Sequence, residues 1–166
     1  SGGHTQFLIV KDINEYEQLG TTIDDALGEA FDKTAKMLDL GYPGGPNVEK
    51  FSKLGDKKFF KLPEPIINKA GCNLSFAGLK TAVLRESKKI NGEDKLKYNL
   101  AASFQNTINK ILYKKTKVKN LVASGGFFMN SVLNGKILEK SNFKNLYIPF
   151  APTDAGNSIG ASLYIA

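Results

Sequence analysis

The chain has 166 residues, of which 42% are hydrophobic and 23% charged, and this balance suffices for one folded core. Its 23 lysines and arginines outnumber 16 aspartates and glutamates, and the formal net charge of +7 favours either a polyanionic partner or a solvated basic surface. The single cysteine, Cys72, excludes an internal disulfide and a four-thiolate zinc site and favours a reducing compartment. No apolar run approaches the roughly 18 to 20 residues that a membrane helix needs.

The first part of the chain predicts a strand followed by an amphipathic helix. Residues 6–10 are a short, β-prone apolar run with turn residues behind it. A helix is predicted from Thr22, which stands three residues before Asp25 in a capping-box-like pair, to about Gly41. Its apolar stripe comprises Ile23, Leu27, Phe31, Thr34 and Leu38, and a second face carries the carboxylates Asp25, Glu29 and Asp32. Residues 41–46 are expected to form a stiff loop.

Further helices are predicted in the middle of the chain. Residues 47–54 favour a short helix, 55–73 a surface stretch, and 74–80 lead into a helix that ends near Lys89. A long helix follows, with an apolar stripe of Leu100, Phe104, Ile108, Ile111 and Leu112 and a solvated basic side that includes Lys110, Lys114 and Lys115.

The final third alternates strands and helices. Strands are predicted at 121–123, as a buried strand, and at 146–148, and helices at 130–138 and 155–166, with a Ser-Gly-Gly turn at 124–126 and a loop at 151–154. This alternation predicts an α/β fold with a parallel or mixed sheet that is covered on both faces.

Two Ser-Gly-Gly turns stand beside apolar strands, at Ser1 and at Ser124. A glycine turn at a strand end lets backbone N–H groups approach a phosphate, and Asn130 after the second turn fits such a site. Either turn could equally be a tight connection without a ligand. His4, the only histidine, is interpreted as structural.

Two aspartates have alternative roles. Asp32 either accepts hydrogen bonds from ribose hydroxyls or pairs with Lys36 at i, i+4. Asp154 follows a strand at the sheet edge where α/β proteins bind ligands, so it either holds a metal through an oxygen or caps the helix at Ala155, a role worth about 1 kcal/mol.

Four blocks together carry a family resemblance: SGGHTQ at residues 1–6, IDDALGEAFDK at 23–33, YPGGP at 42–46 and SFAGLKTA at 75–82. In order and spacing they resemble the TsaD family of tRNA threonylcarbamoyladenosine transferases. The resemblance implies an actin-like (ASKHA, ribonuclease-H-like) α/β fold, with residues 1–166 supplying part of one lobe and most of the second. We expect this TsaD-like domain to be truncated at the N-terminus, where it begins inside a motif without a leader, and also at the C-terminus.

The resemblance implies that the exocyclic amine of the adenosine next to the tRNA anticodon attacks threonylcarbamoyl-AMP and releases AMP. Carried over by position, the binding residues surround one adenylate. Ser1, Gly2 and Gly3 would line its phosphate, Asp32 its ribose and Gly45 its nucleoside, with Glu49, where many relatives have Asp, and Asn130 nearby. No side-chain nucleophile is implied, and ATP or ADP is a further nucleotide ligand.

Asp154 would be a ligand of one divalent metal ion, iron or zinc, whose other ligands in the family are an H-x-x-x-H pair that this chain does not contain. Implied partners are tRNA, a TsaB-like paralogue and a TsaE-like ATPase, or KEOPS-type subunits, in the cytoplasm or an organellar matrix. The C-terminal blocks at 125–131 and 152–160 also resemble the related O-carbamoyltransferases. That activity and a catalytically silent nucleotide-binding paralogue are therefore the alternatives.

Overall fold

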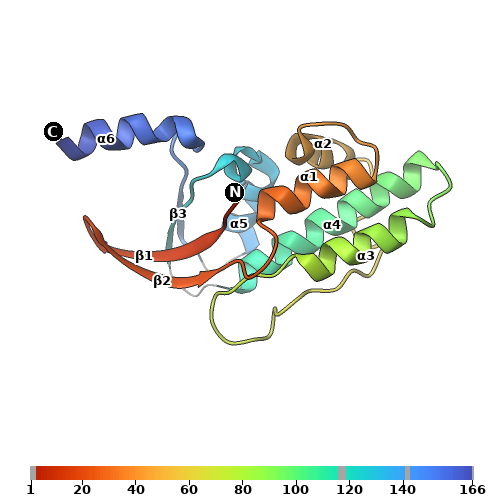
Figure 1. Ribbon diagram of the computed structural model, residues 1–166, viewed down its shortest axis with the longest axis horizontal. Helices are drawn as coiled ribbons and strands as arrows, with labels where there is room; N and C mark the ends of the chain where they lie inside the picture. The colour runs from red at the N-terminus through yellow and green to blue at the C-terminus, as the bar shows by residue number, and fades with distance from the viewer. Residues whose placement is uncertain (1–2, 116–118, 141–142, 166) are drawn as a thin grey trace.

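The computed structural model describes residues 3–115, 119–140 and 143–165. In Figure 1, helices α1 to α4 lie side by side in one half of the molecule, and a curved two-stranded ribbon extends away from them. The C-terminal elements lie between the ribbon and the helices, except that α6 projects outward to the C-terminus. The architecture is therefore mixed α/β, with its main core among helices.

The ribbon pairs strand β1 (Gln6–Asp12) with strand β2 (Glu15–Thr21) in antiparallel register. The turn between them contains Asn14 with a φ of 63°, a left-handed conformation that Asn tolerates. The sequence did not predict β2, because its first four residues are exposed, three of them are Glu or Gln, and no apolar alternation marks the strand.

Helix α1 (Leu27–Met37) begins later than predicted, and the predicted capping box is wrong. The Thr22 hydroxyl donates to the carbonyl of Asp25 (2.8 Å), and Ile23 is 60% exposed rather than part of the core stripe. The N-terminus of α1 is capped from a distance instead, because the Leu27 N–H donates to the Thr5 hydroxyl (3.2 Å). Thr5 thus ties the start of β1 to α1.

Helices α2, α3 and α4 follow, at Gly44–Ser52, Ala77–Ser87 and Asp94–Lys114. The predicted loop at 41–46 is wrong from Gly44 onward, since Gly44, Gly45 and Pro46 form the first turn of α2. Proline is tolerated in a first turn because its missing N–H has no partner there in any case. Both α3 and α4 agree with the sequence prediction, since their periodicity is local.

The core lies where helices α1 to α4 pack together. Phe31 and Phe104 meet edge to face, with ring centroids 5.0 Å apart, and both are almost fully buried. Burial of each such ring contributes about 2–3 kcal/mol. Other fully buried side chains are Leu27, Leu38, Val48, Leu74, Phe76, Leu79, Leu100, Ile108 and Ile111.

Lys115 corrects the prediction of a solvated basic side, because it follows the end of α4 and is only 5% exposed. Its ammonium donates to the carbonyls of Ile66 (2.8 Å), Lys69 (3.1 Å) and Gly71 (3.3 Å). Three carbonyl oxygens replace the water that a buried ammonium loses. Lys115 therefore holds the irregular segment before α3 against the end of α4.

The C-terminal third comprises β3 (Asn120–Val122), the 3-10 turn η1 (Gly126–Met129), α5 (Ser131–Lys140), β4 (Asn145–Tyr147), η2 (Asp154–Gly156) and α6 (Asn157–Ile165). Strands β3 and β4 pair in parallel, so the described residues form two separate two-stranded sheets.

The prediction of one sheet covered on both faces is thus wrong for the described residues. Val122 of β3 is 69% exposed, so β3 is not the buried strand expected, and Tyr147 of β4 is 62% exposed. Strand β1 buries only one face, and that face only partly. None of the helices in the described part of the chain has the length and apolarity needed to cross a membrane.

Candidate functional site

One pocket brings together residues from two blocks that are far apart in the sequence. Gly45 and Glu49 of α2 line it from one side, and Gly126 and Asn130 from the other. Pro43, Pro46, Phe127 and Met129 complete the lining. Three of the predicted binding residues, Gly45, Glu49 and Asn130, therefore share one concave site.

Phe127 anchors the second glycine turn to the helical core. Its ring is 8% exposed and lies 5.1 Å from the Phe31 ring of α1. Gly125 before it has a φ of 109°, which an L side chain rarely adopts, and its N–H donates to the carbonyl of Pro152. The wall of the pocket is thus fixed both to α1 and to the loop before Asp154.

Gly44 and Gly45 differ in what a side chain would meet. A Cβ on Gly44 would overlap the backbone of Asp32 and lie 2.7 Å from Asp32 Oδ1. A Cβ on Gly45 would meet no atom within 4 Å, and Gly45 lines the pocket. Gly44 is therefore required by packing, whereas the absence of a side chain at Gly45 leaves room for a ligand.

Asp32 lies in the neighbouring hollow, with Lys36 and Tyr42 among the lining residues. Its Oδ1 accepts the N–H of Gly44 (2.9 Å), so this carboxylate caps α2 from α1. The alternative ion pair with Lys36 is not formed, and Oδ2 has no protein donor among the described residues. One carboxylate oxygen of Asp32 is thus available to accept a hydrogen bond from a hydroxyl group. Residues 41–46 contribute to the lining of both this hollow and the Gly45 pocket.

The first glycine turn is described only from Gly3, since Ser1 and Gly2 lie outside the described residues. Gly3 is exposed, and a side chain there would meet nothing within 4 Å. His4 and Thr5 line a third hollow together with Ser124 and Phe127. Phe127 borders this hollow and the Gly45 pocket, so the two glycine turns approach the same wall.

His4 agrees with a structural role. Its Nε2 lies 3.1 Å from Gln6 Oε1 and 3.2 Å from the Thr21 hydroxyl, across the β1–β2 ribbon.

Asp154 is exposed at the first residue of η2. The capping role considered for it belongs to Thr153, whose hydroxyl accepts the N–H of Ala155 (3.4 Å). Within the described part of the chain, no group of three His, Cys, Asp or Glu side chains could hold a metal ion. A single exposed carboxylate does not fit the three- or four-ligand set of a zinc or iron site, so these residues alone do not form one.

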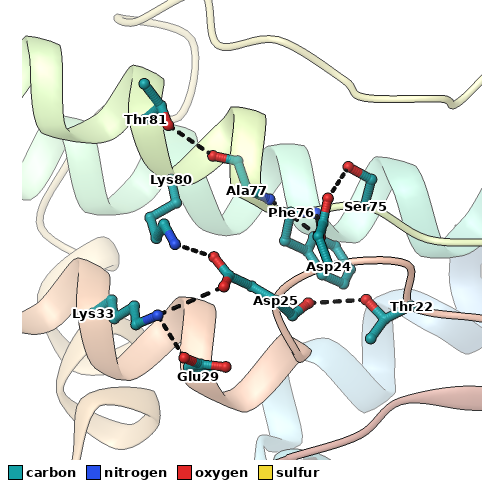
Figure 2. A network of polar contacts seen from close by, with 10 residues as sticks. All are labelled: Thr22, Asp24, Asp25, Glu29, Lys33, Ser75, Phe76, Ala77, Lys80 and Thr81. Carbon is teal, nitrogen blue, oxygen red and sulfur yellow. Dashed lines mark hydrogen bonds and ion pairs between the residues drawn. The ribbon is translucent and has the colours of Figure 1, made fainter.

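A network of polar contacts joins α1 and the residues before it to α3 (Figure 2). The Asp24 carboxylate accepts the Ser75 hydroxyl (2.5 Å) and the N–H groups of Phe76 (2.8 Å) and Ala77 (3.3 Å), which caps α3. Lys80 of α3 reaches back to Asp25. The sequence blocks contained these residues, but nothing in their spacing indicated that they would meet.

Asp25 Oδ2 has the Lys80 ammonium as its partner, and Lys33 lies 3.5 Å from Oδ1 and 2.5 Å from Glu29. The hydrogen bond from Lys80 holds the pKa of Asp25 below its ordinary value of 3.8, and partial burial opposes this shift. The bond to Glu29 raises the pKa of Lys33. The predicted face of three carboxylates is thus divided, since Asp25 and Glu29 share Lys33 while Asp32 caps α2.

A sequence model of the TsaD family, described as tRNA N6-adenosine threonylcarbamoyltransferase, matches residues 1–160. Relatives with that description include one from Pelagibacter ubique, 64% identical over 118 residues, which are 71% of this chain and 33% of the relative. Another from Thermosipho africanus is 47% identical over 159 residues (90% and 48%), and one from Rickettsia rickettsii is 49% identical over 155 residues (83% and 44%).

The chain spans about a third to a half of the length of these relatives. The family match extends through the C-terminal blocks and does not favour the O-carbamoyltransferase alternative. The sequence match over nearly its whole length establishes that the chain belongs to the TsaD family.

Proposed function

We propose that the full-length protein transfers the threonylcarbamoyl group from threonylcarbamoyl-AMP to the exocyclic amine of the adenosine adjacent to the tRNA anticodon. The observation that carries this proposal is the pocket in which Gly45, Glu49 and Asn130 meet. Relatives named for the same activity match the chain on both sides of that pocket. We also propose that the complete protein has the actin-like, ribonuclease-H-like fold of two lobes around a nucleotide.

The described contacts support a division of roles among the binding residues. Asp32 has one oxygen on the N-terminus of α2 and a second for a ribose hydroxyl. Gly45 lets the nucleoside approach the α2 backbone, because no side chain occupies that space. Gly3, with Ser1 and Gly2, would receive the phosphate, and Asn130 would donate from the opposite wall.

In this proposal Asp154 contributes one ligand of a divalent iron or zinc ion, and the other ligands come from elsewhere in the protein. The described residues supply no group of three possible ligands. Proposed partners are tRNA, a TsaB-like paralogue and a TsaE-like ATPase, or KEOPS-type subunits. Because the substrate is tRNA, we propose a cytoplasmic location, with an organellar matrix as the alternative.

Depletion of the protein in its native cells tests the proposed function. We expect threonylcarbamoyladenosine to fall in total tRNA hydrolysates, measured by mass spectrometry, and to return when the wild-type gene is restored. A catalytically silent paralogue would leave the modified nucleoside at its normal level after depletion. Restoration with a Gly45→Ala variant distinguishes a role of the described pocket from an indirect effect, since that variant should fold and fail to restore the modification.

A further inference from the structure

A second concave surface lies away from the proposed adenylate site, between α4 and the irregular segment that follows α2. Its lining includes four lysines, Lys57, Lys58, Lys61 and Lys110, against one carboxylate among the described lining residues, Glu64. We call this surface the lysine groove. Glu64 is already engaged, because Lys110 Nζ lies 3.2 Å from its Oε1.

The other three lysines are exposed and form no ion pair within the described residues. Asp56, which precedes them, uses its Oδ1 to accept the backbone N–H of Lys58 (2.9 Å). Three uncompensated ammonium groups within five residues repel one another. This local excess of positive charge attracts a polyanion to the groove.

The groove is held in shape by one face of α4, whose polar residues recur at helical spacing. Asn99 Oδ1 accepts the N–H of Asp56 (2.7 Å), and the Ser103 hydroxyl accepts that of Phe60 (3.1 Å). Farther along, Asn106 donates to the carbonyl of Lys57 (3.4 Å). Since the backbone is fixed at several points, a ligand would not have to order this segment on binding.

Aromatic side chains within the lysine run indicate which polyanion fits. Phe60 lines the groove, and the Phe59 ring beside it, 5.0 Å away, is 54% exposed. An exposed ring among lysines offers a stacking surface for an unpaired base next to phosphate contacts, whereas an acidic protein surface would use only the charges.

We propose that the lysine groove is a docking surface for the tRNA substrate, outside the adenylate pocket. This inference rests on the proposed function. Gly45 of the pocket stands at the start of α2, whose nine residues span about 13 Å, and the segment that lines the groove follows the end of this helix in the chain. A folded RNA arm is long enough to place one nucleotide in the pocket and its neighbouring backbone in the groove.

Binding of an unmodified tRNA transcript to the full-length protein tests the proposal. A triple variant, Lys57→Gln, Lys58→Gln and Lys61→Gln, should bind about tenfold or more weakly at moderate salt. The slope of log Kd against log salt should fall by about 0.7 to 0.9 for each lysine that contacts a phosphate. Phe59→Ala should weaken binding about fivefold or more with little change in that slope.

The matched control removes the same charge elsewhere, by Lys88→Gln, Lys114→Gln and Lys144→Gln, three exposed lysines that do not line the groove and form no ion pair within the described residues. This control should retain the wild-type affinity and salt slope. Thermal unfolding monitored by circular dichroism should agree for the lysine variants, because each substituted lysine is exposed. Phe59→Ala also loses the ring contact with Phe60, so its tRNA binding is measured well below its own melting temperature.

Kinetics of transfer distinguish this inference from the proposed function. With a working wild-type enzyme, the groove variant should raise the KM for tRNA and leave the KM for threonylcarbamoyl-AMP unchanged. Equal tRNA affinity of the groove and control variants would overturn the docking proposal and leave the function standing. A groove variant that lost binding of a protein partner but kept its tRNA affinity would also overturn the docking proposal. Wild-type protein that binds tRNA through the groove but transfers nothing would refute the proposed function instead.

Discussion

Gly44 and Gly45 are adjacent glycines with different surroundings, because a side chain would overlap Asp32 at Gly44 and would meet open space at Gly45. The backbone of Asp32 lies against Gly44, and the pocket lies against Gly45. A comparison of two alanine substitutions therefore separates the structural from the functional contribution at this helix end.

Gly45→Ala should leave the free energy of unfolding unchanged or up to about 1 kcal/mol higher, since alanine favours the helix. Its kcat/KM for transfer should fall about tenfold or more, because the added methyl occupies ligand space. Gly44→Ala should destabilise the protein by about 1–3 kcal/mol through overlap with Asp32. Chemical denaturation and transfer assays on both variants give the comparison, and a fully active Gly45→Ala enzyme would contradict the assigned role.

Asp154→Ala is expected to abolish transfer by the full-length protein and to lower its bound iron or zinc, with the melting temperature unchanged. The fold should tolerate the change because Asp154 is exposed and Thr153 provides the local cap. Elemental analysis and an activity assay check both effects. Thr153→Ala is the control, since it removes the cap and retains the carboxylate. Retained activity of Asp154→Ala would exclude Asp154 as a required ligand.

Between elements, α1 and α3 are joined by two adjacent aspartates with different partners. Asp24 caps the start of α3, and Asp25 binds the Lys80 side chain one turn later (Figure 2). Because α1 also carries Asp32 and receives the Thr5 cap, this junction fixes the helix on which the candidate site is built.

Asp25→Asn should destabilise the protein by about 1–2 kcal/mol at pH 7 through loss of the charged bond to Lys80. Because the folded pKa of Asp25 lies below its ordinary 3.8, the stabilisation is complete well above pH 3.8. It is lost as the pH falls through the lowered pKa, so wild type and variant should converge in strong acid. Urea unfolding from pH 7 to pH 2 measures the gap, and a constant gap would contradict this assignment.

Lys115→Met should destabilise the protein by about 2–3 kcal/mol, because three carbonyls of the 66–71 segment lose a charged donor. Lys114→Met is the matched control. Lys114 is the neighbour of Lys115 in the chain and its side chain is exposed, so this substitution should change stability by no more than about 0.5 kcal/mol. Hydrogen exchange should rise in the 66–71 segment of the Lys115 variant alone. Equal stability of the two variants would refute this role of the buried ammonium.

Across the whole molecule, the aromatic core and the polar face of α4 each position a different concave surface. The core around Phe31 and Phe104 positions the Gly45 pocket through Phe127, and the polar face beginning at Asn99 positions the lysine groove. The excess of positive charge that the sequence displays is therefore partly concentrated on one surface.

Local regularity explains which elements the sequence could predict. Helices α3 and α4 and strand β1 were recognisable because their own residues carry the periodicity or the β-prone run. Strand β2 and the start of α1 were not recognisable, since β2 has no apolar alternation and the cap of α1 comes from Thr5, which lies just before β1. A pattern within one segment does not record a partner that is distant in the chain.

The sequence by itself determined the family, because its motif blocks retain their order and spacing, and it determined which residues are candidates for binding. Only the tertiary structure decided that Gly45, Glu49 and Asn130 share a pocket, that Asp32 caps α2 and that Lys115 is buried. These outcomes depend on contacts between segments separated by many residues, and such contacts are set by packing of the whole chain rather than by local pattern.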